Sequence, residues 1–138
     1  MRLDKFTIKA QEALQTSQQI AERFNNQQIE PEHLMLALME QKEGVIPSLL
    51  GKLGAEQARL VEDFEAAVDK FPKVSGAGMG QVYISPRTKN LLDRAFIEAE
   101  QMKDEFVSLE HILLAAIEEK DGDAAKILVQ HGVTRETV

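Results

Sequence analysis

The feature that most constrains this chain is an internal repeat, because the sequence matches itself at an offset of 78 residues. Residues 6–55 align with residues 84–133 without a gap. Identical pairs recur along the alignment: Leu14 and Leu92, Glu32 and Glu110, His33 and His111, Leu36 and Leu114, and Gly54 and Gly132. Such a duplication indicates two copies of one supersecondary unit, neither of which can bury its apolar face alone. We therefore expect two halves related by a pseudo-two-fold axis.

Each copy has the pattern of three helices. The expected starts are Thr7 and Ser85 for the first helix, near residue 31 and Ser108 for the second, and near residues 45 and 123 for the third. The second helices carry the apolar runs 34–39 and 112–117. A helix that is apolar nearly all round is a buried one, so these two are expected at the centre of the fold. Gly54 and Gly132 suit a left-handed conformation after the third helices.

The segment between the copies predicts one more amphipathic helix, at about residues 55–70. A mobile glycine-rich connector is expected to follow it, at residues 72–81. The prediction is an all-α domain of about eight helices over residues 1–138, with repeat one at 6–55, the link at 56–83 and repeat two at 84–133. The tail, residues 134–138, looks like the opening turn of another helix, so we expect further protein after it.

Composition excludes several classes of protein. The formal net charge of −7 argues against a general binder of nucleic-acid phosphates, which needs clustered lysine and arginine. The absence of cysteine excludes disulfides and thiolate chemistry. The start lacks the apolar core of a signal peptide, and no apolar run approaches the roughly 20 residues that a membrane span needs. We expect a soluble cytoplasmic protein that binds neither nucleic acid nor membrane.

No motif for catalysis or for a cofactor occurs in the sequence. The Walker A pattern is missing, and the glycines at residues 76–80 fit a flexible connector better than a phosphate loop. The three histidines lack the spacing of metal ligands. For His33 and His111, which occupy equivalent positions, we expect a structural role with hydrogen bonds across the repeat interface. A binding module without catalytic residues, metal or cofactor is therefore favoured over a helical enzyme.

Four segments resemble a known family: residues 1–7 (MRLDKFT), 30–34 (EPEHL), 71–76 (FPKVSG) and 107–115 (VSLEHILLA). They are similar to the double Clp N-terminal repeat, which precedes the ATPase modules of ClpA, ClpB and ClpC proteins. The first and third segments are most similar to the ClpB type. This resemblance covers essentially the whole chain.

The resemblance implies the substrate-recognition domain of a homohexameric AAA+ disaggregase. The domain would bind unfolded or aggregated polypeptides in the stress response, and a DnaK-type chaperone system would act with the whole protein. ATP and Mg²⁺ would belong to ATPase modules outside this chain. The alternative within the family is a domain that docks adaptors and substrates for a ClpA- or ClpC-type unfoldase associated with a protease. The sequence after Val138 would distinguish the two.

The resemblance also implies a polar client-binding patch. The family positions that match Thr7, Asp104 and Glu110 form a surface patch linked to client handling. Glu32 and Ser85 are their repeat-related counterparts and are added as candidates. In ClpC relatives the two repeat glutamates bind phosphorylated arginine. Whether that ligand is recognised here is left open, because this chain has different residues beside both glutamates.

Differences between the copies suggest an apolar client-binding groove. An apolar residue whose counterpart is polar or small is not required by the shared core. This criterion selects Phe96 and Ile97, which align with two glutamines, and Leu109, which aligns with Pro31. The three are candidates for an exposed groove edge. The alternative for Phe96 is that it fills space in an asymmetric core.

Overall fold

The computed structural model describes residues 3–41, 44–74 and 82–138. Its helices are η1 (Leu3–Lys5, a 3-10 helix), α1 (Ile8–Arg23), α2 (Pro31–Glu40), α3 (Val45–Leu53), α4 (Gln57–Asp69), α5 (Pro86–Gln101), α6 (Leu109–Glu118) and α7 (Ala124–Gln130). The only strands in these ranges are β1 (Gln28–Ile29) and β2 (Tyr83–Ile84). The all-α class with about eight helices is therefore confirmed. Most of the expected glycine-rich connector, residues 75–81, lies outside the described residues.

The helix ends follow from the residues that the sequence places there. The Thr7 hydroxyl accepts a hydrogen bond from the Ala10 N–H (3.1 Å), and the Ser85 hydroxyl accepts one from the Thr88 N–H (3.1 Å). Each satisfies one amide group that the first turn leaves without a helical partner. At the other end of each repeat a glycine with positive φ lies just after the third helix, Gly54 with φ of 75° and Gly132 with φ of 81°. These starts and stops agree with the predicted ones.

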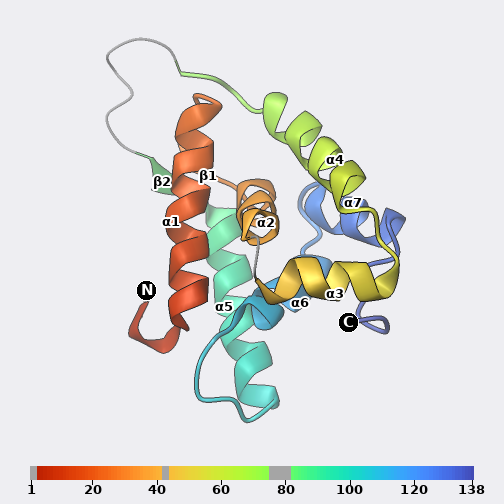
Figure 1. Ribbon diagram of the computed structural model, residues 1–138. Helices are drawn as coiled ribbons and strands as arrows, with labels where there is room; N and C mark the ends of the chain where they lie inside the picture. Colours follow the sequence, from red (N-terminus) through yellow and green to blue (C-terminus); the bar gives the residue numbers. More distant parts are fainter. Residues whose placement is uncertain (1–2, 42–43, 75–81) are drawn as a thin grey trace.

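The second helix of each repeat, α2 or α6, lies at the centre of the molecule. Figure 1 shows α2 with α1 on one side and α4 on the other, and both flanking helices contact it. All residues of α2 except the last are buried. Residues of both repeats join in one apolar core, which includes Leu36 and Ile112. The two helices therefore hide the apolar runs that the sequence shows, as expected.

Two short parallel pairings connect the repeats, and the sequence did not reveal them. In β1–β2, Ile29 lies opposite Ile84. The equivalent residues of the opposite repeats, Val107 and Phe6, form a parallel bridge. In both places the backbone before the first helix of one repeat hydrogen-bonds to the backbone before the second helix of the other. The amino end of α1 therefore lies beside that of α6, and the amino end of α5 lies beside that of α2.

In the described part of the chain, no helix combines the length and the apolar character that crossing a membrane requires.

Candidate functional site

Thr7, Asp104 and Glu110 lie close in the chain to the parallel bridge between Phe6 and Val107, which connects the two repeats. The Thr7 N–H donates to the Val107 carbonyl (2.9 Å), which lies between the other two residues in the chain. Asp104 is exposed, and its carboxylate accepts a hydrogen bond from His111 Nε2 (2.8 Å). Glu110 is exposed in the first turn of α6, and no hydrogen bond or ion pair from the described residues reaches its carboxylate. These three residues can form a polar surface patch.

Glu32 and Ser85 are not part of this surface, so their assignment to an accessible patch is wrong. Glu32 is only 1% exposed, and its two oxygens lie 3.3 and 3.1 Å from the guanidinium of Arg87. Ser85 is also buried, and its hydroxyl caps α5 and hydrogen-bonds to the Thr88 hydroxyl. The Glu32 side chain is used to hold the two repeats together, and the Ser85 side chain is used to cap its own helix.

The two repeat glutamates differ because their basic neighbours differ. Arg87 reaches Glu32 across the repeat interface and also binds Glu119 with two contacts, of 3.0 and 2.8 Å. Burial disfavours the charged guanidinium, but hydrogen bonds to Glu119 and Glu32 raise the pKa of Arg87 above its usual range. The residue equivalent to Arg87 is Lys9, an exposed lysine whose amine lies 3.8 Å from Glu12 on the same helix. Glu110 is therefore left open to a partner.

The two equivalent histidines make the same pair of hydrogen bonds. In each, Nδ1 accepts from the backbone N–H of the residue before the helix, at 2.8 Å for His33 and 2.9 Å for His111. Nε2 then carries the proton and donates to Asn26 Oδ1 (2.8 Å) or to Asp104 Oδ2 (2.8 Å). These bonds stay within each repeat, so the predicted structural role is supported but the predicted bonds across the interface are wrong. Burial lowers the pKa of His33 to about 4.

Of the three apolar candidates, one is buried, one is exposed and one is half-buried. Leu109 is only 3% exposed, because the first turn of α6 turns its side chain into the core, so the predicted exposure is wrong. Ile97 is 44% exposed, as predicted. Phe96 stacks on Phe6 with ring centroids 5.2 Å apart, which agrees with the alternative that it fills space between the repeats.

Phe96 also lines a surface pocket of about 360 Å³, which we call the Asp104 pocket. Its lining consists of Lys5, Phe96, Ala99, Glu100, Asp104, Glu105 and Val107. Three of these side chains are carboxylates and one is a lysine, so the pocket is acidic. It connects Asp104 of the polar patch with an aromatic ring, which suits a partner that offers a basic group beside an apolar one.

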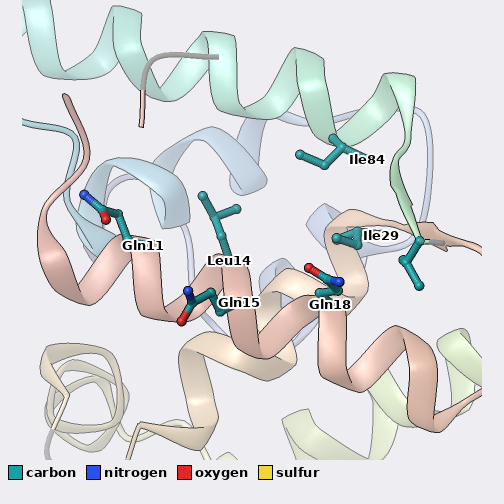
Figure 2. Close-up of a pocket in the computed structure, with 7 residues that line it drawn as sticks. Gln11, Leu14, Gln15, Gln18, Ile29 and Ile84 are labelled. Carbon is teal, nitrogen blue, oxygen red and sulfur yellow. The ribbon is translucent and has the colours of Figure 1, made fainter. Parts of the chain in front are cut away.

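A second cavity, of about 350 Å³, lies between α1 and the β1–β2 pairing, and we call it the α1 groove (Figure 2). Its lining consists of Gln11, Leu14, Gln15, Gln18, Ile29, Val82 and Ile84. No lining residue is charged, and Ile84 is 40% exposed. The groove therefore offers apolar surface bordered by amides, in a chain whose net charge is −7.

The α1 groove was not predicted from the sequence, although the repeat carries a signal for it. The criterion applied to the repeats treated the apolar member of each unequal pair as the exposed one. At the pair Gln18 and Phe96 the opposite holds. The Phe96 ring stacks on Phe6, which is 2% exposed, whereas the shorter polar side chain of Gln18 leaves Ile84, the residue equivalent to Phe6, 40% exposed.

Among the described residues, no group of three or more histidine, aspartate and glutamate side chains is arranged to hold a metal ion.

Comparison with known proteins identifies the family of the chain. Residues 5–131 match the family described as the Clp repeat (R) N-terminal domain. The chaperone protein ClpB of Rhodopseudomonas palustris is 37% identical over 134 residues, which are 97% of this chain and 15% of that protein. ClpB of Nitratidesulfovibrio vulgaris is 42% identical over 121 residues, which are 86% of this chain and 14% of that protein. The chain thus spans about one seventh of the length of these relatives.

Solved structures share the fold at low sequence identity. The N-terminal domain of Hsp104 from Candida albicans superimposes with a TM-score of 0.82 at 22% identity, covering 96% of this chain and 85% of that one. A ClpV N-domain solved in complex with a VipB peptide gives a TM-score of 0.75 at 17% identity, covering 97% of this chain and 82% of that one. With the family match over nearly its whole length, the chain belongs to the family of Clp repeat N-terminal domains.

Proposed function

We propose that the chain is the client-recognition domain of a ClpB-type protein disaggregase. It binds unfolded or aggregated polypeptides in the cytoplasm under stress and delivers them to a hexameric AAA+ ring, with which a DnaK-type chaperone system acts. In this proposal ATP and Mg²⁺ are bound by other parts of the whole protein, and this domain contributes binding alone. The support is the family match and the ClpB relatives at 35–42% identity.

The observation that carries the proposal is the α1 groove. A folded monomer covers most of its large apolar patches, and a groove that stays open is a place for a partner. Unfolded chains expose aliphatic and aromatic side chains, which gain about 25 cal/mol per Å² of apolar surface that they bury. The uncharged lining adds no cost of burying an unpaired charge. A polypeptide segment of low charge is the partner that fits.

The acidic surface around Asp104 gives a second contact for the same client. Asp104 and Glu105, in the segment between α5 and α6, line one pocket, and Glu110 is exposed in the first turn of α6. Basic residues that flank an apolar client segment would be attracted there, with a range of about 8–10 Å at physiological salt. Each contact is weak, but six tethered copies raise the effective concentration of client near a ring.

A second candidate function is the docking of a specific adaptor peptide. The complex between a ClpV N-domain and a VipB peptide favours it, because that domain has a similar fold and was solved with a peptide of one named protein. An adaptor would bind as one sequence with a fixed register, whereas unfolded clients would bind as many unrelated sequences.

The test is an NMR titration of this chain with a permanently unfolded model protein. Ile84→Asp places a charge in the groove and should weaken binding about tenfold or more, because a buried unpaired charge is costly. Val129→Asp is the matched control, since Val129 is similarly exposed but lies on α7. Ile97→Asp tests the site that the sequence predicted. Binding that survives Ile84→Asp would remove the groove from the proposal, and loss only in Ile97→Asp would move the site to the second repeat.

A functional test uses the whole parent protein. Thr7→Ala and Asp104→Ala should slow the recovery of an aggregated reporter enzyme while ATP hydrolysis by the ring stays unchanged. Recovery at the unmodified rate in both variants would refute the role of the polar patch.

A further inference from the structure

The internal duplication provides a template for what the α1 groove can hold. The positions equivalent to Gln18 and Ile84 are Phe96 and Phe6 in the opposite repeats. In that half of the molecule the two rings stack with centroids 5.2 Å apart and planes inclined by 28°. In the groove half, neither ring is present.

The apolar floor of the two places is alike, whereas Gln11 and Gln15 at the rim correspond to the charged Lys89 and Asp93. Leu14, which lines the groove, is equivalent to Leu92, and both leucines are part of or pack against the core. Ile29 of the groove is equivalent to Val107, another buried β-branched residue. The groove therefore keeps the two apolar residues that are equivalent to Leu92 and Val107 but lacks the aromatic ring of Phe96.

We propose that the α1 groove binds an aromatic side chain of a client polypeptide, in the position that the Phe96 ring occupies in the other repeat. The inference rests on the proposed function and specifies what that site selects. The client ring would cover Ile84, which is 40% exposed, whereas its counterpart Phe6 is only 2% exposed under the Phe96 ring.

The rest of the lining suits the backbone that carries such a ring. Gln15 and Gln18 lie one turn apart on the exposed side of α1 and border the groove (Figure 2). A glutamine amide has one acceptor and two donors, and although Gln18 Nε2 donates to Glu22 (3.4 Å), its second N–H and its oxygen can pair with the C=O and N–H groups of an extended segment. The volume of about 350 Å³ is at the small end of ligand sites, and it fits one ring with its flanking backbone rather than a folded element.

The experiment uses Gln18→Phe, which installs the missing ring from within the chain. The new ring should stack against Ile84, fill the groove and exclude the client, so affinity should fall about tenfold or more. Gln19→Phe is the matched control, because it adds the same ring at the next position of α1, which is exposed and does not line the groove. Thermal melts of both variants check that each is folded.

The probes are three unstructured peptides that differ at one central residue, which is phenylalanine, leucine or alanine, in an uncharged sequence. The unmodified chain should prefer the phenylalanine peptide to the alanine peptide by about five- to tenfold, with leucine between them. The Gln18→Phe variant should lose this preference, and Gln19→Phe should keep it.

The outcomes separate this inference from the proposed function. Equal affinity for the three peptides, or full binding by Gln18→Phe, would overturn the aromatic assignment while polypeptide binding itself stands. If neither the peptides nor an unfolded protein binds to the unmodified chain, the proposed function fails as well.

Discussion

Replacing Arg87 by methionine should lower the free energy of unfolding of this domain by about 3–5 kcal/mol, the range observed when one partner of a buried ion pair is removed. Arg87 makes two contacts each to Glu32 and Glu119, all between 2.8 and 3.3 Å. Those carboxylates are only 1% and 8% exposed, so neither can regain full hydration once the guanidinium is gone. A typical domain has about 5–15 kcal/mol in total, so the loss is a large share.

The duplication supplies the control. Lys9→Met changes the equivalent residue, but that side chain is 62% exposed and its ion pair with Glu12 spans 3.8 Å. A surface pair of this kind contributes about 0–0.5 kcal/mol. Urea unfolding followed by circular dichroism at pH 7 measures both variants. At this chain length, melting temperatures should differ by roughly 10 °C or more.

A further variant tests the cause. Adding Glu32→Gln and Glu119→Gln to Arg87→Met removes the charges of the two hydrogen-bonded partners and leaves Glu30, which lies 3.7 Å from Arg87, unchanged. Stability should recover in part, because neutral amides cost less to bury than carboxylates. If Arg87→Met and Lys9→Met unfold within about 1 kcal/mol of each other, the account of a buried inter-repeat ion cluster is refuted.

Two other predictions follow from neighbouring features. Gly122→Ala should be destabilising only while Arg87 is present, because the added Cβ would overlap the Arg87 guanidinium. Gly51→Ala is the control: it adds a Cβ into open space and should stabilise α3 by up to about 1 kcal/mol. Additive effects of Gly122→Ala and Arg87→Met on the free energy of unfolding in urea would contradict the overlap. Since burial lowers the pKa of His33 from 6.5 to about 4, the unfolded chain takes up this proton first as the pH falls. Stability should therefore decrease between pH 6.5 and 4, by up to about 3 kcal/mol. Asn26→Asp, which gives His33 the carboxylate partner that the other repeat has, should flatten this decrease, and an unchanged slope would show that His33 does not cause it.

Much of the fold could be predicted because its signals are local. The repeat, the N-caps at Thr7 and Ser85 and the glycines after the third helices depend on residues close together in the chain, and the structure agrees with each. The two apolar helices at the centre followed from their composition alone.

The site was less predictable, because burial and pairing depend on residues far apart in the chain. The polar patch candidates Glu32 and Glu110 are equivalent in the repeat, but Arg87 and the Asp123 N–H, both far along the chain, hydrogen-bond to Glu32, which is buried. Gln18 and Phe96 occupy equivalent positions, and the sequence shows that they differ. It does not show that the groove forms beside Gln18.

The sequence by itself determined that this protein has two equivalent helical units whose apolar helices must face each other, since helix periodicity and capping are encoded within a few turns. Only the tertiary structure decided how far the equivalence goes. One example is Glu98, which is equivalent to Ile20 and, like it, buried. Hydrogen bonds from Arg135 and Arg94 outweigh the effect of burial and hold the pKa of Glu98 below its usual range. Pairing a buried charge requires a partner brought from elsewhere in the chain, and a local pattern cannot specify such a contact.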